Sequence, residues 1–275
     1  MKQHVRYVLL ILLSATIVSS CLKEQSSLSR ETHRMTDEAD KDLKQRGMTN
    51  TFKGPEVHVG DGKVRSFIVI SHSGVPQELG FELTHSVMQG LPSSGENSYI
   101  IPLHQKSLTV TPFDHMELDW NPQGHPPVGI YTVPHFDFHF YKISLAAQLA
   151  IPAEDNTTAA LFNNYPPAGY LPAGYVPGPG GVAQMGLHWL DVTSGEFHGS
   201  PFTKTFVYGT YNGEVTFYEP MVTKAFIEST SYSSADFRQP LYFAPSGSYY
   251  PTRYNVYTDP STGNYYVSLS NFIWR

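Results

Sequence analysis

Apolar and polar positions alternate in short runs over most of the chain after residue 50, and this pattern predicts β-strands. The run 64–71, VRSFIVIS, is rich in β-branched residues and follows the turn sequence Gly60-Asp61-Gly62. Helical patterns are short by comparison. They cover residues 83–90 and 144–151, and Ser144 is the expected N-cap of the second helix.

Two β-hairpins are predicted from turn sequences between alternating segments. Residues 203–211 and 214–219 flank Asn212-Gly213, and Asn-Gly is a strong hairpin signal because both turn positions require a positive φ. Residues 254–257 and 265–269 form the second pair. These patterns predict a mainly β fold, an antiparallel sandwich or barrel of about ten strands with a few short helices.

The composition excludes several classes of protein. Only 15% of the 275 residues are charged, and the formal net charge is −6. Because phosphate binding needs a basic surface, no nucleic-acid partner is expected. The 22 glycines and 21 prolines favour a turn-rich β architecture. A single cysteine excludes an intramolecular disulfide, a cysteine-based zinc finger and an iron–sulfur cluster.

The first 21 residues resemble the signal of a bacterial lipoprotein. Two basic residues precede an apolar run of about twelve residues, 7–18, and Ser19-Ser20 then lead into Cys21. A transmembrane helix needs roughly 20 apolar residues, so the run fits the apolar region of a signal peptide better. The sequence 18–21, VSSC, is similar to a lipobox, which implies cleavage before Cys21 and acylation of its thiol, for example with palmitate.

An ordinary signal peptide with an incidental cysteine is the alternative interpretation. The lipobox is favoured because the one cysteine of the chain occupies the position that is acylated. Leu22 follows it, whereas enterobacterial lipoproteins retained in the inner membrane usually have Asp there. Two basic side chains leave with the signal, so the mature chain has a net charge of −8. We expect a lipid-anchored envelope protein, at the outer membrane rather than the inner, held by acyl chains and not by a basic patch.

The segment after the cysteine has a different composition from the rest. Twelve of the 29 residues from 22 to 50 are charged, and such a stretch cannot bury enough apolar area to offset its ordering entropy. The predicted organisation is a signal peptide at 1–20, an acylated cysteine with a charged flexible tether at 21–52, and a single β-rich domain at 53–275.

Residues 163–184, NNYPPAGYLPAGYVPGPGGVAQ, interrupt the strand pattern. The segment repeats Pro-Ala-Gly-Tyr at 167–170 and 172–175. Long loops in compact domains are usually functional or disordered, and the tyrosines argue against disorder. We therefore expect a packed loop over a site. Residues 178–183 match G-x-G-x-x-A formally, but the prolines and the lack of a strand and helix around them exclude dinucleotide binding.

Histidines suggest where the chemistry lies. Residues 134–141, PHFDFHFY, alternate strictly, and a strand would direct the three phenylalanines to the core. The opposite face would then carry His135, Asp137, His139 and Tyr141. His135 and His139 are two same-face steps apart, so one metal cannot bind both without a bulge or strong curvature. Asp137 is better placed beside either histidine.

His188 is the best second source of ligands, because it directly follows the Pro/Gly segment, and Glu196 stands eight residues beyond it. Imidazole combined with carboxylate suits Zn, Fe, Mn or Cu. The sequence predicts one divalent transition metal, bound by His135, His139 and His188, with His125 or Glu196 completing the ligand set. Supporting roles around these ligands are expected for Asp137, Tyr141 and His115. The alternative is a polar network in which the histidines bond carboxylates and carbonyls.

The histidine blocks also carry a resemblance to a family. Trp120-Asn-Pro-x-Gly-His125-Pro-Pro and 134–141, followed by Met185-Gly-x-His188-Trp, resemble an uncharacterised family of secreted bacterial proteins with a domain of unknown function. The resemblance spans most of 55–275 and implies a mostly β secreted domain. It implies no reaction or ligand set. The H-x-D-x-H spacing is also loosely similar to that of cupin metal sites. The remaining cupin pattern is absent, so this similarity is no more than an analogy.

Three hypotheses for the function follow. The first is a metal-binding envelope lipoprotein, without a specified reaction. The second is a metal-free module that binds a small molecule or glycan through exposed tyrosines and tryptophans, at 165–175, Trp120 and Trp189. The third is a structural envelope protein that self-associates into a homo-oligomer. The membrane, through the N-terminal lipid, is the one partner common to all three.

Overall fold

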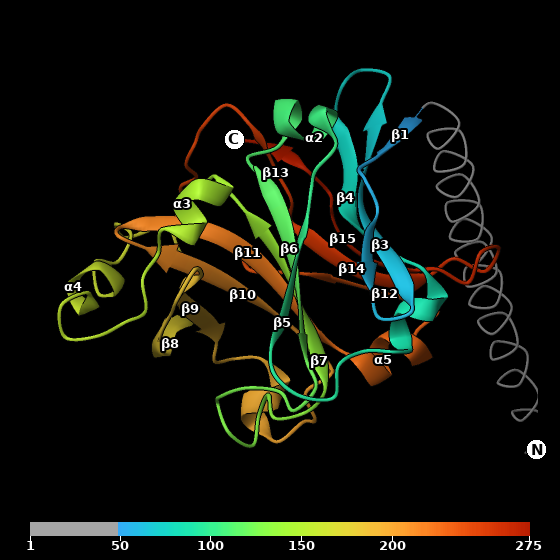
Figure 1. Ribbon diagram of the computed structural model, residues 1–275. Helices are drawn as coiled ribbons and strands as arrows, with labels where there is room; N and C mark the ends of the chain where they lie inside the picture. Colours follow the sequence, from blue (N-terminus) through green and yellow to red (C-terminus); the bar gives the residue numbers. More distant parts are fainter. Residues whose placement is uncertain (1–48) are drawn as a thin grey trace, which may run out of the picture. The chain divides into compact units, whose positions relative to one another are not determined.

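The computed structural model describes residues 49–275, which form a β domain (Figure 1). The predicted signal peptide, Cys21 and most of the predicted tether lie outside the described residues. The described strands pair into two seven-stranded antiparallel sheets and one two-stranded sheet. The predicted mainly β fold class is therefore confirmed.

The first sheet has the strand order β1-β3-β4-β15-β14-β12, with β2 paired to β3. Its strands are β1 (Thr49–Lys53), β2 (Val57–Val59), β3 (Gly62–Ser71), β4 (Pro76–Leu83), β12 (Tyr232–Asp236), β14 (Arg253–Thr258) and β15 (Tyr265–Ser270).

The second sheet has the order β5-β6-β7-β11-β10-β9-β8 and carries the polar residues considered below. Its strands are β5 (Asn97–Ile101), β6 (His115–Asn121), β7 (His135–Tyr141), β8 (Tyr175–Val182), β9 (Gly186–Asp191), β10 (Lys204–Tyr211) and β11 (Glu214–Thr223). The small sheet pairs β13 (Tyr249–Tyr250) with β16 (Ile273–Trp274).

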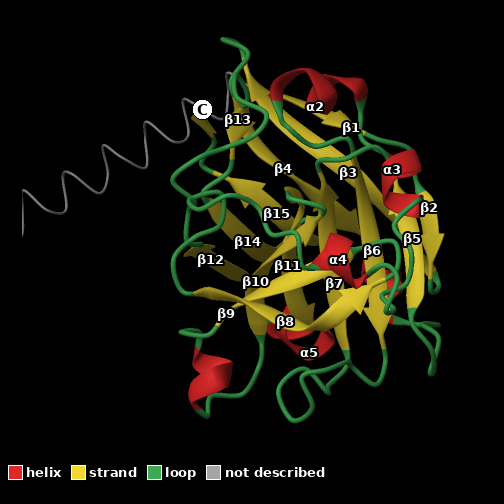
Figure 2. Ribbon diagram, turned by 90° about the vertical axis from the view of Figure 1, so that its left-hand side faces the viewer, coloured by secondary structure: helices red, strands yellow, loops and turns green. Residues whose placement is uncertain are grey.

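Helices are short and lie in the connections between strands (Figure 2). The α-helices are α2 (Gln105–Val110), α3 (Leu145–Leu149), α4 (Ala159–Phe162) and α5 (Lys224–Ser229), and the 3₁₀ helices are η1 (His85–Met88) and η2 (Gly195–His198). Ser144 caps α3 as predicted, since its side chain accepts a hydrogen bond from the backbone N–H of Ala147. No helix of the described part of the chain is long and apolar enough to span a membrane.

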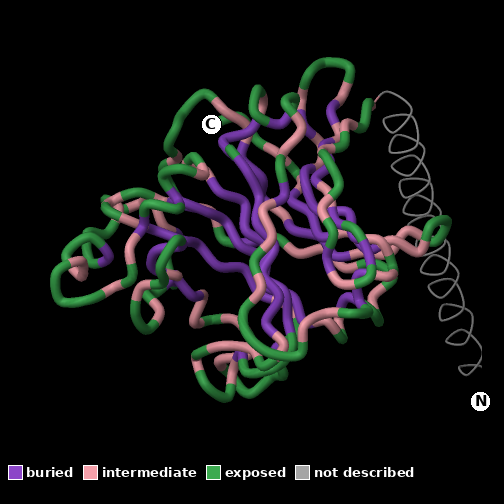
Figure 3. Tube along the Cα trace, in the orientation of Figure 1, coloured by how far each residue is buried: buried purple, intermediate pink, exposed green. Residues whose placement is uncertain are grey.

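The two large sheets pack face to face, and neither is closed on itself, so the architecture is a sandwich (Figures 1 and 2). Phe81 of β4 lies edge-on against Phe138 and Phe140 of β7, with ring centroids 5.1 and 5.3 Å apart. The prediction that the phenylalanines of β7 face the core is confirmed. Because the whole of β7 is buried, its polar face is covered as well (Figure 3).

Both predicted hairpins are present. Strands β10 and β11 pair across Asn212 and Gly213, whose φ angles of 47° and 86° are the positive values that this turn requires. Strands β14 and β15 form the second hairpin. Where the sequence predicts a helix over residues 83–90, the structure has only the 3₁₀ helix η1.

Two boundaries differ from those predicted. Strand β1 begins at Thr49, so residues 49–52 belong to the first sheet and not to the tether. Within 163–184, residues 175–182 form β8, which pairs with β9 through a register shift between Pro177 and Gly181. The irregular register lets a Pro/Gly sequence join a sheet edge without supplying every ladder hydrogen bond.

Candidate metal centre

The polar faces of β6 and β7 lie side by side on the outer side of the second sheet. In the antiparallel register, Asp119 is opposite Asp137, Glu117 is opposite His139 and Asn121 is opposite His135. Strand β6 alternates like β7, so its apolar residues face the core while its carboxylates join the histidines. Glu219 of β11 and His188 of β9 extend this polar surface across the sheet.

The first group of metal-binding side chains comprises His125, His135 and Asp137. The Nε2 atom of His125 lies 3.3 Å from Oδ2 of Asp137, and the Nε2 atom of His135 lies 3.2 Å from Oδ1. Asn121 donates a hydrogen bond of 2.7 Å from its side-chain amide to Oδ2. Asp137 is thus held in a fixed orientation between two imidazoles.

Backbone carbonyls fix the tautomer of both imidazoles in this group. The Nδ1 atom of His135 is 2.7 Å from the carbonyl oxygen of Val133, and that of His125 is 2.7 Å from the carbonyl oxygen of Pro126. Because a carbonyl oxygen only accepts, each Nδ1 carries a hydrogen and donates it. A neutral imidazole then presents a lone pair at Nε2, the arrangement found in metal-bound histidines.

The second group comprises His139, His188 and Glu219. Nε2 of His139 lies 3.7 Å from Oε1 of Glu219, and Nε2 of His188 lies 3.5 Å from Oε2. On its other side, Nδ1 of His139 lies 3.3 Å from Oδ2 of Asp119. A carboxylate behind a histidine orients the ring and raises its basicity as a ligand.

Unpaired polar atoms are concentrated at these two groups and at Asp119 beside them. Twelve buried side-chain nitrogen and oxygen atoms of the described residues have no hydrogen-bond partner of acceptable geometry. Eight of them belong to Asp119, His135, Asp137, His139 and Glu219. An unsatisfied buried polar atom is costly, so a concentration of them in one place calls for a specific explanation.

Burial and neighbouring charges shift the pKa values of several side chains in the two groups. Burial disfavours a charged imidazole, but Asp137 outweighs this effect and raises the pKa of His125 to about 9. Burial is likewise outweighed at His139, where Glu219 and Asp119 raise the pKa to about 10. Burial raises the pKa of Glu219 to about 8, in spite of the favourable charge of His139.

His188 is affected in the opposite direction. Burial and the nearby charges of His139 and His125 lower its pKa to about 3. Its imidazole is therefore neutral at neutral pH, which is the form that binds a metal. For Asp137, burial alone would raise the pKa, but His135 and His125 hold it well below its usual value. At neutral pH, His188 of the second group is thus neutral and Asp137 of the first group is ionised.

A cavity of about 260 Å³ opens onto both groups. His125 and Asp137 of the first group and His188 of the second line it, whereas His135 and His139 are fully buried beneath. Its other walls come from the loop before β7, from β8 and from neighbouring strands: Glu96, Pro126, Pro127, Tyr131, Gly178, Pro179, Gly180, Val182, Met185, Leu190 and Met221. The Pro/Gly strand β8 therefore covers part of this site.

The predicted single ligand set is divided in the structure. His135 joins His125, whereas His139 joins His188, as expected for two same-face positions separated by Asp137. Glu196 is in neither group and instead accepts a hydrogen bond from the hydroxyl of Tyr131.

The residues predicted to support the ligands are buried beside them. His115 stacks on Tyr141 with ring centroids 4.9 Å apart, and its Nε2 is 2.6 Å from the side-chain oxygen of Gln148. Tyr141 in turn stacks on His139 at 5.5 Å. Trp120 and Trp189, predicted as exposed contact residues of a binding module, are buried, and so they cannot form such a surface.

Sequence reasoning missed Glu219 and Asp119. The predicted strand ended at Glu219, but β11 continues to Thr223, which places this carboxylate in the middle of a buried strand. The alternation of residues 115–121, HMELDWN, is the sequence signal that places Asp119 on the polar face of β6.

Comparison of the chain with protein-family models, with curated proteins and with solved structures gave no match in any of the three. The resemblance to a secreted family of unknown function stays a prediction.

Proposed function

We propose that this domain binds divalent transition metal ions at the two groups, one formed by His125, His135 and Asp137 and the other by His139, His188 and Glu219. The observation that carries the proposal is the set of eight unpaired atoms, which includes a potential ligand atom from each of His135, Asp137, His139 and Glu219. A cation placed among such atoms would satisfy them together.

The distances support this proposal. Metal–ligand bonds of roughly 2.0–2.1 Å at tetrahedral angles put neighbouring ligand atoms about 3.3 Å apart. Nitrogen and oxygen atoms of the first group are 3.3 and 3.2 Å apart, and those of the second are 3.5 and 3.7 Å apart. The first group is therefore closer to the geometry of a bound ion.

The donor set indicates the class of metal. Each group offers two imidazoles and one carboxylate, a combination that suits Zn, Fe, Mn or Cu. Three protein ligands leave coordination positions open, and the cavity beside His125 and His188 gives water or a small molecule access to them. A metal held there would lower the pKa of a bound water molecule.

Metal content of the purified full chain tests the proposal. We expect up to two equivalents of Zn²⁺, Fe²⁺, Mn²⁺ or Cu²⁺ after loading and desalting, measured by mass spectrometry of the metals. Asp137→Asn and Glu219→Gln keep the side-chain shape, and each should remove the equivalent bound by its own group. His58→Ala, at an exposed histidine of β2, is the matched control and should leave the content unchanged.

The competing explanation is a polar network in which protonated histidines pair with the carboxylates. In that case the full chain would retain no metal after desalting, and the metal content of Asp137→Asn and Glu219→Gln would equal that of the unmodified protein. Either result would overturn the metal proposal.

We further propose that this metal-binding domain is anchored in the bacterial cell envelope through acylated Cys21, at the outer membrane rather than the inner. The support is the apolar run 7–18 followed by the single cysteine. Acyl chains, and not basic residues, supply the anchoring energy, because the mature chain is acidic.

A further inference from the structure

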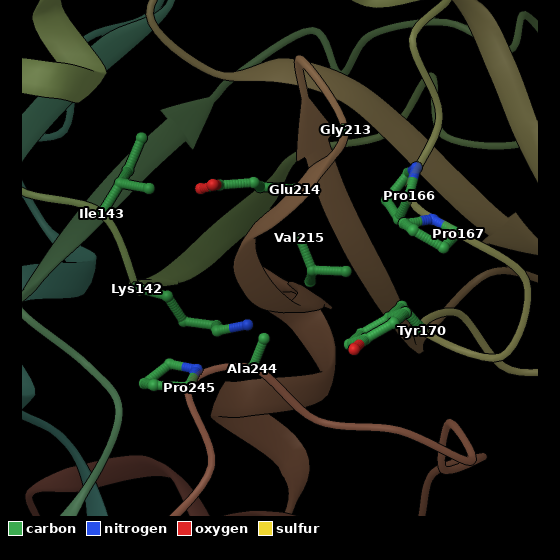
Figure 4. Close-up of a pocket in the computed structure, with 10 residues that line it drawn as sticks. All are labelled: Lys142, Ile143, Pro166, Pro167, Tyr170, Gly213, Glu214, Val215, Ala244 and Pro245. Atoms are coloured by element: carbon green, nitrogen blue, oxygen red, sulfur yellow. The ribbon is translucent and has the colours of Figure 1, made fainter.

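A second cavity of about 360 Å³ lies apart from the candidate metal centre and shares none of its lining residues. Four segments enclose it (Figure 4): the end of β7, the loop before β8, the start of β11 and the loop before β13. Its lining residues are Lys142, Ile143, Pro166, Pro167, Tyr170, Gly213, Glu214, Val215, Ala244 and Pro245. A volume of this size is within the range of small-molecule sites.

Lys142 gives the cavity its one cationic group. No hydrogen bond or ion pair to its ammonium nitrogen is present among the described residues, and the centroid of the Tyr250 ring is 5.8 Å from it. Burial lowers the pKa of Lys142 to about 8, although the charge of Glu214 opposes this effect. A half-buried ammonium without a paired anion is poorly stabilised, and an anionic ligand would relieve this.

Apart from Tyr170 and Glu214, the remaining lining residues are apolar or glycine. Three proline rings, together with Ile143 and Val215, leave the cavity with few hydrogen-bonding groups. In Figure 4 the Tyr170 hydroxyl and the Lys142 amine point toward the same central space. A flat apolar body would contact the proline and tyrosine rings, while its polar end would reach the ammonium and the hydroxyl.

The walls are held together before any ligand binds. Backbone N–H groups of Leu241 and Tyr242 both donate to the carbonyl oxygen of Gly169, each at 2.9 Å, which joins the loop before β8 to the loop before β13. The backbone N–H of Lys142 donates to the carbonyl oxygen of Thr216 at 2.7 Å. A preformed site avoids part of the entropy cost of binding.

We infer that this cavity binds a small aromatic or apolar molecule that carries one carboxylate, with Lys142 as the counter-ion and Tyr170 as a hydrogen-bond donor. Glu214 lines the same cavity, and its negative charge disfavours ligands with two or more negative charges, such as phosphate monoesters.

Titration of the purified full chain with benzoate, indole-3-acetate and 4-hydroxyphenylacetate tests this inference, with the primary amide of each acid as a neutral isostere. By ligand-observed NMR, we expect at least one acid to bind saturably below about 5 mM and about tenfold more tightly than its amide. Lys142→Met keeps the length of the side chain and should abolish the preference for the acid. Lys106→Met, at an exposed lysine of α2, should leave the preference unchanged.

Three results would overturn the inference: no acid binds in this range, acid and amide bind equally, or Lys142→Met keeps the preference. Tyr170→Phe adds an independent readout, since loss of one hydrogen bond should weaken the acid severalfold without changing the fold. Asp137→Asn should bind the acids like the unmodified protein, so the outcome here and the outcome of the metal test are separable.

Discussion

The Nε2 atom of His135 lies 3.2 Å from Oδ1 of Asp137, and neither atom has a hydrogen-bond partner although both are buried. The histidine donates from Nδ1 to the carbonyl oxygen of Val133, so its neutral form directs a lone pair at the carboxylate. Such a contact is repulsive unless a positive charge lies between the two atoms. A metal ion or an additional proton is therefore needed between the two atoms. A chelator would remove the metal ion but not the proton.

Metal binding is expected to stabilise the fold. An ion that binds only the folded chain adds about 2.7 kcal/mol when its free concentration is 100 times the Kd. Loading with metal should raise the Tm, and a chelator should reverse the rise. In Asp137→Asn the increase should be smaller, because one of the two groups has lost its carboxylate. Calorimetry with and without chelator measures these changes in Tm. A Tm that neither metal loading nor chelation alters would contradict the expectation.

His188→Phe separates packing from metal binding. The ring of His188 lies 5.2 Å from that of Phe217 and is partly exposed to the cavity, so an aromatic replacement should be tolerated. The expected result is a metal-free Tm close to that of the unmodified chain, with one equivalent of metal lost. A variant that retains both equivalents would exclude His188 as a ligand.

Asp119→Asn tests the carboxylate behind His139. Their side-chain atoms are 3.3 Å apart, and Asp119 belongs to neither group of potential ligands. Loss of its charge should weaken metal binding by about 10–100-fold through the less basic and less well-oriented imidazole. The affinity of the second group, measured by competition with a chromogenic chelator, checks this. Affinity at the group that contains Asp137 should stay unchanged.

Alternation along single strands made part of the candidate site predictable. The pattern of residues 134–141 was sufficient to separate the core face of β7 from its polar face, and the spacing of His135 and His139 already argued against one shared ion. The Asn212-Gly213 turn likewise predicted the pairing of β10 with β11.

Contacts between strands that are distant in sequence could not be derived in this way. Glu219 meets His188 and His139 because β11 pairs with β7 on one side and β10 on the other. The local pattern of a strand shows which of its faces is buried, but it does not show which other strands pair with it. The Pro/Gly composition of β8 disfavours a strand and predicts a loop, and only the pairing of β8 with β9 overrides that preference.

Cys21→Ala is expected to abolish membrane anchoring. The sequence predicts Cys21 as the acylated first residue of the mature chain, and replacement of its thiol removes the attachment point. The variant should lose its fatty-acid label and move from the membrane fraction to the soluble fraction. Metabolic labelling and fractionation measure both. If the variant still sedimented with membranes like the unmodified protein, the lipoprotein prediction would be wrong.

Glu82→Gln is expected to destabilise the first sheet in a pH-dependent way. Burial would raise the pKa of Glu82, but hydrogen bonds from Arg65, at 3.0 and 3.1 Å, and from Lys53, at 2.8 Å, outweigh it and lower the pKa to about 2. A lowered pKa stabilises the fold above the unfolded value of about 4.5, and this contribution is lost as the pH falls toward 2. At pH 7 the variant should lose about 2–3 kcal/mol, and the difference should shrink between pH 4.5 and 2. Urea unfolding across this range measures it, with the exposed Glu228→Gln as the control, and a difference independent of pH would contradict the assignment.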